Sequence, residues 1–366
     1  MTAPTRLRKL RWGVPIAATA AVAVVASGVL TAEADPPLPP KTAGQLLVDV
    51  QGASVKGLSG TVVQDSDLGL PDLPYAGTGG GGGAGLASLL TGSHTLRVWY
   101  AGEDKQRVAL LDSLGETDVV RNGTDAWLWS SESNSATRFR VPAGGAGAKA
   151  ADELPAGVTP QQAAETALRA LDPTTSVSTD GTRQVAGRDA YELVLAPKDT
   201  RSLVGQVRLA VDAETSVPLR VQVFPKATGD GPAFSVGFTS VSFEVPGDEH
   251  FAFSPPPGVT VTEGTLPADP PGKADRAKAE RAKAERAAGA ARTVGSGWTT
   301  VAILPAPTGE PDGAAAAFLE QLPRVSGSWG SGRLLTSALM SALLTDDGRL
   351  LVGAVGPDLL YAAAGR

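Results

Sequence analysis

The sequence predicts an α+β protein: one large curved antiparallel sheet capped by helices, followed by a small C-terminal α+β domain. Short segments that alternate apolar and polar residues recur along most of the chain, and Gly, Asn, Asp and Ser separate them. The 44 Gly and 28 Pro in 366 residues also favour short strands and turns over a bundle of helices. A sheet of so many strands curls, and helices lying across its mouth would cap it.

The first 34 residues have the pattern of an export signal. Residues 1–11 contain basic but no acidic side chains, and an uncharged, mainly apolar run extends from Trp12 to Thr31. Ala32 and Ala34 then favour cleavage before Asp35. The run is close to the roughly 18 to 20 apolar residues that span a bilayer, so an uncleaved anchor stays open as the alternative. We therefore expect a protein that is either secreted or held at the outer face of the cytoplasmic membrane.

The remaining chain is predicted to form two domains. It is longer than one core usually serves, and its lack of Cys excludes disulfides, a lipobox and thiolate metal sites. We place a main domain at residues 35–263, a charged linker at 264–296 and a small domain at 297–366. The RAKAE repeat in the linker is typical of solvated helical spacers, and a basic helix that binds a membrane surface or a partner is the alternative. The net charge of −6 argues against nucleic acid as a partner.

The main domain is predicted to contain two helices. The first covers residues 42–53 behind a Thr cap and precedes an extended run at 54–66. The second begins with Thr159 as the cap and Pro160 in the first helical position. A Gly-rich stretch at 70–93 is too broken to form an element, and we interpret it as a long mobile connection.

Strand patterns fill the rest of the main domain. Five short alternating segments lie between residues 94 and 142 and predict an antiparallel meander. Four longer alternating runs lie between residues 182 and 245. In the small domain, Asp347 and Gly348 between two apolar runs predict a hairpin followed by a short helix, while a helix over 333–344 is the rival interpretation.

No motif in the sequence nominates an enzyme or a cofactor. Residues 77–82 satisfy G-x-G-x-x-G, but the flanking segments lack the strand and helix that a phosphate-binding loop requires. His94 and His250 are the only histidines, and neither has a neighbouring His or Cys that could complete a metal site. A hydrolase that recruits one of them remains the weakest hypothesis.

Pairs of apolar residues at period 2 predict one apolar face of the sheet. An ordinary packed core is the simple interpretation of this face. Because two short helices cannot cover so wide a sheet, part of the face could instead line a ligand cavity. Val207 is predicted to share this face, and the predicted ligand-binding residues are Val98, Tyr100, Trp127, Trp129, Leu193, Leu195, Leu209, Val221, Val223, Phe234 and Phe238.

Several segments of the main domain resemble the LolA family of lipoprotein carriers. Residues 122–142 are similar to that family's small turn, Trp-containing strand and hairpin, and residues 187–198 with 207–224 are similar to its later strands. The closing segment, 234–261, contains an F-x-F-x-P-P-x-G-V signature. That signature is formed by Phe251, Phe253, Pro255, Pro256, Gly258 and Val259.

The resemblance covers roughly residues 42–262 and implies an incomplete β-barrel whose concave face, lidded by helices, accepts acyl chains. It also implies an arginine that ties the sheet to the lid, with Arg97 as the first candidate and Arg107 as the second. The Gly-rich insertion and the additional domain depart from simple LolA proteins. The RseB family, whose members add a smaller C-terminal domain to this sheet, is the second resemblance.

These expectations lead to two main hypotheses of function. The first is a non-enzymatic protein that binds lipid or lipid-modified protein in an apolar concave pocket and transfers it, without a cofactor. The alternative is an RseB-like sensor or regulator that contacts a membrane-bound partner, such as an anti-sigma factor or an ABC transporter.

Overall fold

The computed structural model describes residues 38–70, 92–111, 115–141, 159–169, 173–227, 231–264, 292–306 and 313–366. The predicted export signal, the part of the Gly-rich stretch at 71–91 and the charged repeat at 265–291 lie outside these residues. Within them, no helix is both long enough and apolar enough to cross a membrane.

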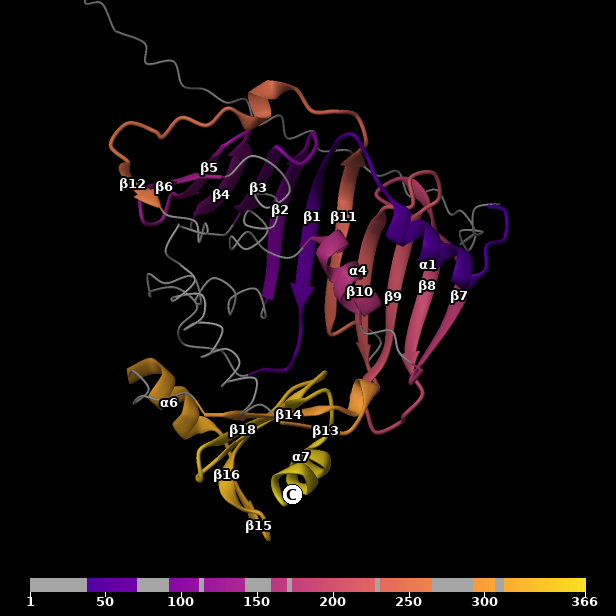
Figure 1. The fold of residues 1–366 in the computed structure, drawn as a ribbon, viewed down its shortest axis with the longest axis vertical. Helices are drawn as coiled ribbons and strands as arrows, with labels where there is room; N and C mark the ends of the chain where they lie inside the picture. Colours follow the sequence, from indigo (N-terminus) through magenta and orange to yellow (C-terminus); the bar gives the residue numbers. More distant parts are fainter. Residues whose placement is uncertain are drawn as a thin grey trace, which may run out of the picture. The chain divides into compact units, whose positions relative to one another are not determined.

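The large sheet contains twelve strands in the described part of the chain and is not closed into a barrel (Figure 1). Its spatial order is β12-β6-β5-β4-β3-β2-β1-β11-β10-β9-β8-β7. All neighbours pair antiparallel except β12 and β6, which are parallel. The strands are β1 (Leu58–Ser66), β2 (Gly92–Tyr100), β3 (Lys105–Leu111), β4 (Glu116–Asn122), β5 (Asp125–Ser130), β6 (Ser135–Arg140), β7 (Thr175–Val185), β8 (Arg188–Pro197), β9 (Val204–Asp212), β10 (Pro218–Pro225), β11 (Phe234–Ser242) and β12 (Thr260–Gly264).

The sheet consists of two meanders, β1 to β6 and β7 to β11, which join where β1 pairs with β11. The predicted curved antiparallel sheet is thus confirmed. One detail of the prediction was wrong, because the run that begins at Thr182 is a hairpin and not a single strand. Ala186 and Gly187 both have positive φ, 53° and 75°, which is the backbone that a two-residue hairpin turn requires.

Both predicted helices are present, and each covers part of the second meander. Helix α1 (Ala43–Gly52) begins with the capping box formed by Thr42 and Gln45. It contacts β7 and β8, while helix α4 (Pro160–Arg169) contacts β10 and β11. Leu46, Val50 and Ala164 from these helices are buried in the core that lies on this face of the sheet. We call this face the inner face and the opposite one the outer face.

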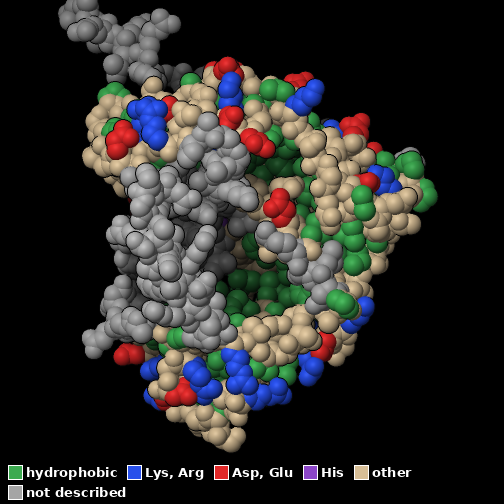
Figure 2. Space-filling model, in the orientation of Figure 1, with side chains coloured by type: hydrophobic (Ala, Val, Ile, Leu, Met, Phe, Trp, Pro, Cys, Tyr) green, Lys and Arg blue, Asp and Glu red, His purple; other side chains and the backbone are tan. Residues whose placement is uncertain are grey.

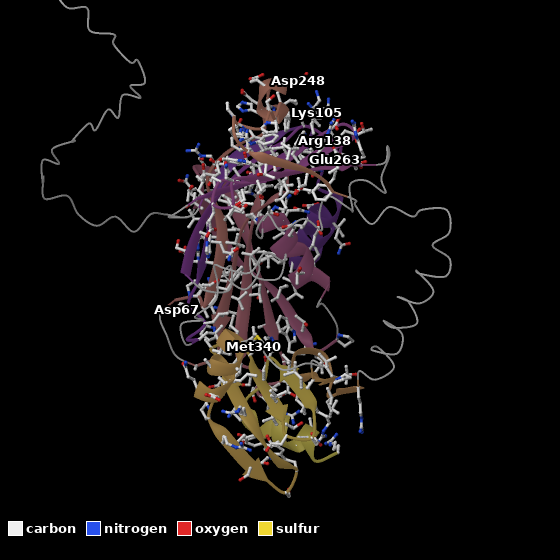
Figure 3. All side chains as sticks on the ribbon, turned by 90° about the vertical axis from the view of Figure 1, so that its left-hand side faces the viewer. Asp67, Lys105, Arg138, Asp248, Glu263 and Met340 are labelled. Atoms are coloured by element: carbon white, nitrogen blue, oxygen red, sulfur yellow. The ribbon has the colours of Figure 1, made fainter. Side chains whose placement is uncertain are left out.

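A second covering segment lies on the outer face of the first meander. We name residues 247–258 the outer strap; it contains the short 3-10 helix η1 (Asp248–Phe251) and leads into β12. Lys105 pairs with Asp248 at 2.6 Å, and these two residues lie side by side in Figure 3. At the other end, Asn134 donates a hydrogen bond to the carbonyl of Gly258 at 3.0 Å.

The small C-terminal region forms a separate six-stranded sheet, ordered β13-β14-β18-β17-β16-β15. The predicted hairpin at Asp347 and Gly348 joins β17 to β18, so the rival helix over 333–344 is wrong. The core of this six-stranded sheet packs against the final helix of the chain. The elements are β13 (Arg292–Val294), η2 (Gly297–Thr299), β14 (Val301–Pro305), α6 (Gly313–Gln321), β15 (Arg324–Gly327), β16 (Gly330–Thr336), β17 (Ser341–Thr345), β18 (Arg349–Gly353) and α7 (Pro357–Ala364).

Candidate ligand-binding site

The register of the large sheet determines which predicted residues share a face. Directly paired residues on neighbouring strands project to the same side. The pairs Val62–Leu96 and Val98–Val108 extend the inner face into the first meander. Nine of the predicted ligand-binding residues lie on this inner face, together with Val207: Val98, Tyr100, Leu193, Leu195, Leu209, Val221, Val223, Phe234 and Phe238.

Most of these inner-face residues form a closed core under the helices. Leu193, Leu195 and Leu209 are 0% exposed, and Val221 is 1% exposed. Val223 and Phe234 are partly buried and pack against the same core. Side chains that are sealed in this way stabilise the fold by roughly 1.5 to 3 kcal/mol each and cannot contact a ligand without rearrangement. The inner face of β7 to β10 is therefore mainly core.

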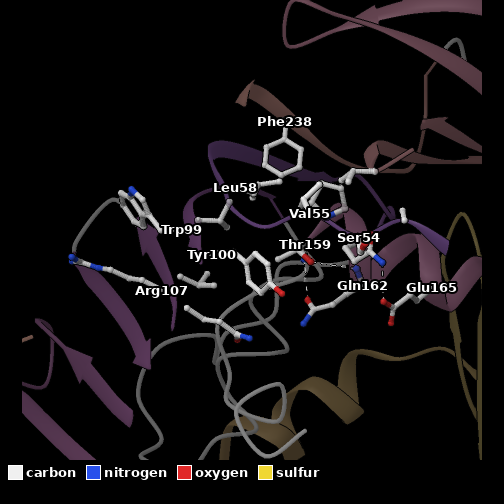
Figure 4. Close-up of a pocket in the computed structure, with 17 residues that line it drawn as sticks. Ser54, Val55, Leu58, Trp99, Tyr100, Arg107, Thr159, Gln162, Glu165 and Phe238 are labelled. Atoms are coloured by element: carbon white, nitrogen blue, oxygen red, sulfur yellow. Dashed lines mark hydrogen bonds between the residues drawn. The ribbon is translucent and has the colours of Figure 1, made fainter. Parts of the chain in front are cut away.

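A cavity of about 440 Å³ opens where the inner face passes from β11 through β1 to β3 (Figure 4). Hydrophobic side chains also gather in the hollowed centre of the view in Figure 2, with charged side chains on its rim. Three predicted residues, Val98, Tyr100 and Phe238, line the cavity. The other lining residues are Ala53, Ser54, Val55, Leu58, Trp99, Gln106, Arg107, Val108, Thr159, Pro160, Gln161, Gln162, Glu165 and Val217.

One wall of the cavity is polar and is formed by the start of α4. Thr159 and Gln162 exchange hydrogen bonds of 3.0 and 3.3 Å between side chain and backbone, which caps this helix beside the cavity. The phenol of Tyr100 projects toward the same wall in Figure 4. Burial, with a smaller effect of the charge on Glu103, raises the pKa of Tyr100 above its ordinary value. Its hydroxyl is consequently neutral at physiological pH.

Trp127 and Trp129 lie on the outer face, which corrects the prediction that they share a face with Val98 and Tyr100. Their cross-strand partners, Val120 and Asp118, belong to the outer-face rows of the first meander. Phe253 of the outer strap packs against both indoles, at ring-centroid distances of 5.3 and 6.4 Å. Alternation within β5 correctly groups the two Trp residues, but only the pairing across β3 and β4 decides their side.

Arg97 also lies on the outer face, paired with Thr61 and Ala109, and its side chain is exposed. Helices α1 and α4 cover the inner face, so the prediction that Arg97 ties the sheet to a helical lid is wrong. Arg107, the second candidate, projects to the outer face as well. Its guanidinium forms an ion pair with the buried Asp118 and donates to the carbonyl of His250 at 3.4 Å. Arg107 thus ties the sheet to the outer strap and not to a helical lid.

The two histidines lie on opposite faces of the sheet. His94 is buried on the inner face opposite Gln64, whereas His250 stacks on the outer-face Trp99 at 5.6 Å. Among the described residues there is also no group of three or more His, Cys, Asp or Glu side chains placed to hold a metal ion. These positions do not bring the two imidazoles into one site.

Comparison with known families supports the resemblance stated from the sequence. Residues 90–229 match the family model of the MucB/RseB N-terminal domain. The matched segment runs from β2 to the end of β10, so it includes both meanders except β1 and β11, together with helix α4. Among curated proteins, none matches the sequence.

The chain is also similar to solved structures of low sequence identity. The Pseudomonas aeruginosa MucA/MucB complex is 16% identical, with 88% of this chain and 96% of that chain covered and a TM-score of 0.40. A LolA superfamily protein from Nitrosomonas europaea is 12% identical, with coverages of 58% and 99% and a TM-score of 0.20. The Mycobacterium tuberculosis lipoprotein LppX is 9% identical, with coverages of 54% and 94% and a TM-score of 0.29.

Sequence reasoning missed the cavity wall contributed by β1, β3 and the start of α4. Leu58 and Val108 alternate with polar neighbours, so period 2 could have placed each on an apolar face. Thr159 was identified as a helix cap, but nothing in its local sequence indicates that the cap adjoins a cavity. That proximity arises because α4 crosses β10 and β11 with its first turn toward β1.

The position of Trp129 predicts that its replacement affects stability and leaves the cavity intact. Trp129→Asp removes packing against Phe253 and places a carboxylate directly opposite Asp118, which is 2% exposed. We expect the free energy of unfolding, measured by urea denaturation, to fall by about 3 kcal/mol or more. Binding of an apolar fluorescent probe by the protein that remains folded should be unchanged.

Trp127→Asp is the matched control, because the same substitution there places the carboxylate near Arg138. The Arg138 guanidinium lies 5.5 Å from the Trp127 ring centroid, so it can pair with the new charge. The loss of stability should therefore be smaller than for Trp129→Asp. If Trp129→Asp instead abolished probe binding while keeping wild-type stability, the outer-face placement would be wrong.

Proposed function

We propose that the protein binds a lipid or a lipid-modified protein in the inner-face cavity and passes it on without covalent chemistry. The observation that carries this proposal is the cavity itself, which has an apolar side formed by half-buried aliphatic and aromatic side chains of the sheet. Val55, Leu58 and Val108 are only partly buried although they are apolar, so a ligand would complete their burial.

The size of the cavity suits part of an acyl chain. Its volume of about 440 Å³ lies within the range of roughly 300 to 1,000 Å³ that is typical of small-molecule sites. Burial of each methylene contributes about 0.8 kcal/mol, so eight methylenes contribute on the order of 6 kcal/mol before the entropy of ordering the chain is subtracted. Reversible capture and release follow from an affinity of this size.

The polar wall supports a preference for the ligand's head group. Glu165 lines this wall from α4, and its side chain accepts a hydrogen bond from Gln161 at 3.0 Å. Arg107 also borders the cavity, but its guanidinium is bound to Asp118 on the outer face. Among the described lining residues, the charge left facing the cavity is therefore negative. A neutral or cationic head is favoured over a carboxylate.

The first test is a charge on the apolar side of the cavity. Val108→Asp should weaken binding of a fluorescent fatty acyl probe to the chain from Asp35 to Arg366 by about tenfold or more, which corresponds to about 1.4 kcal/mol. The reason is that a carboxylate among the acyl contacts must lose its hydration when the ligand binds. A fluorescence titration measures this change in affinity.

Val63→Asp is the control for that variant, because Val63 is also partly buried but lies on the outer face, opposite Thr95. It should bind the probe with wild-type affinity. The proposed function is overturned if wild-type protein neither carries extractable lipid nor binds any acyl probe. Equal weakening by both variants would show that the cavity is not the binding site.

The second test concerns the head group. Wild-type protein should bind an acyl probe with a neutral glycerol head about threefold more tightly than one with a free carboxylate at low ionic strength. Glu165→Gln should remove most of this difference, because it keeps the size of the side chain and deletes the charge. Competition titrations with the two unlabelled amphiphiles measure the ratio, and a ratio that Glu165→Gln leaves unchanged would contradict the role of Glu165.

A regulator of the RseB kind is the second candidate, and the match of residues 90–229 to the MucB/RseB domain favours it. In this case the small sheet region would contact a membrane-bound partner such as an anti-sigma factor or an ABC transporter, and the cavity would sense lipid. Cross-linking in native membranes tests it. A chain that ends at Gly264 should keep probe binding and lose the cross-linked partner; if the full chain recovers no membrane protein, the carrier function is favoured.

A further inference from the structure

Three arginines converge on one buried carboxylate on the outer face of the second meander, away from the cavity. Glu192 on β8 is 2% exposed. Its carboxylate lies 2.8 Å from a guanidinium nitrogen of Arg208, 3.6 Å from Arg183 and 3.8 Å from Arg220. The arginines come from β9, β7 and β10, and their side chains are 25%, 36% and 29% exposed. They can therefore be reached from solvent.

The cluster holds more positive charge than Glu192 requires. Asp180 supplies a second carboxylate, 3.0 Å from Arg208 and 3.9 Å from Arg183. Among the described residues, three guanidinium groups thus face two carboxylates. Burial, together with the charges of Arg183 and Arg208, lowers the pKa of Arg220 although Glu192 opposes the shift. Bringing these guanidinium groups together therefore costs electrostatic energy, which Glu192 offsets only in part at Arg220.

Arg220 is the arginine of the cluster whose N–H donors are not used in hydrogen bonds among the described residues. Its distance of 3.8 Å from Glu192 exceeds hydrogen-bond length, and among the described residues its guanidinium makes no hydrogen bond. Partly desolvated guanidinium donors are usually bound to an acceptor. Arg208, by contrast, is held by Glu192 and Asp180 and lies over the ring of Phe224.

The sheet beneath Arg220 carries small residues in the same row. Ala210 lies directly between Glu192 and Arg220, and Gly237 pairs with Arg220 on its other side. A Cβ at Gly237 would lie 2.9 Å from the Arg220 side chain, so glycine leaves room for that side chain to lie along the sheet. Gln222 and Ser235 occupy the adjacent row of the same face and add neutral polar groups.

We propose that this outer-face cluster binds an oxyanion of single negative charge, a carboxylate or a phosphate diester, with Arg220 as its principal ligand. The guanidinium of Arg220 presents two parallel N–H donors, and these match the two oxygens that a carboxylate or a phosphate diester presents. The single positive charge of Arg220, which no hydrogen-bonded carboxylate offsets among the described residues, matches one negative charge. Arg183 and Arg208 add electrostatic attraction while remaining bound to Glu192. The site is separate from the proposed lipid cavity, since the two occupy opposite faces of the sheet.

The experiment is a calorimetric titration of the chain from Asp35 to Arg366 at constant ionic strength. Acetate and dimethyl phosphate are the two probes, and chloride is the reference anion. We expect both oxyanions to bind more tightly than chloride, and Arg220→Gln to weaken their binding by about fivefold or more. Arg220→Lys should give intermediate binding, because it keeps the charge and loses the two parallel donors.

Arg201→Gln is the matched control. Arg201 lies in the connection between β8 and β9 of the second meander. Its side chain is 64% exposed and, among the described residues, pairs only with Asp199. Its replacement should leave oxyanion binding unchanged. The proposal is overturned if the protein binds chloride as tightly as it binds the oxyanions. It is also overturned if Arg220→Gln lowers the melting temperature without altering the affinity for the oxyanions. If Arg220→Gln fails to fold, the proposal is overturned instead by an Arg220→Lys protein that binds the oxyanions with wild-type affinity.

Discussion

The strict alternation of side chains along hydrogen-bonded strands is the constraint on which the rest of this structure depends. Each residue of the large sheet projects to the inner or the outer face, and a shift of one residue in the pairing would exchange the two sets. The pairing from β12 to β7, which is interrupted only by a few bulges, therefore places most of the apolar core on one side. It equally fixes the aromatic residues beneath the outer strap and the arginine cluster on the other.

The cavity follows from how much of the inner face the helices can cover. Twelve strands spaced about 4.8 Å apart form a sheet on the order of 50 Å wide. Helices α1 and α4 contain ten residues each and are about 15 Å long. They seal the core over β7 to β11, and the apolar surface that continues onto β1, β2 and β3 is left partly open. The same packing thus creates both the core and the candidate site.

The outer face is organised by different interactions in its two halves. Over the first meander, the outer strap covers Trp99, Trp127 and Trp129, and Arg107 holds it through Asp118 and the carbonyl of His250. Over the second meander, charged side chains take that position, and Glu192 lies beneath arginines. Buried carboxylates stabilise a fold only when cations offset their lost hydration. Glu192 therefore requires arginines nearby, but it does not require three of them.

The sequence alone determined the class of the fold and much of its local structure. Period-2 alternation identified most of the strands, Thr42 and Thr159 marked the helix starts, and Asp347 with Gly348 marked a hairpin, because these signals act between residues close in the chain. It also grouped Trp127 with Trp129 correctly. Only the tertiary structure decided that they face away from Val98 and Tyr100, that Leu193 and Leu209 are sealed, and that the α4 cap borders a cavity. Those outcomes depend on register and helix crossing between distant segments, which local alternation does not encode.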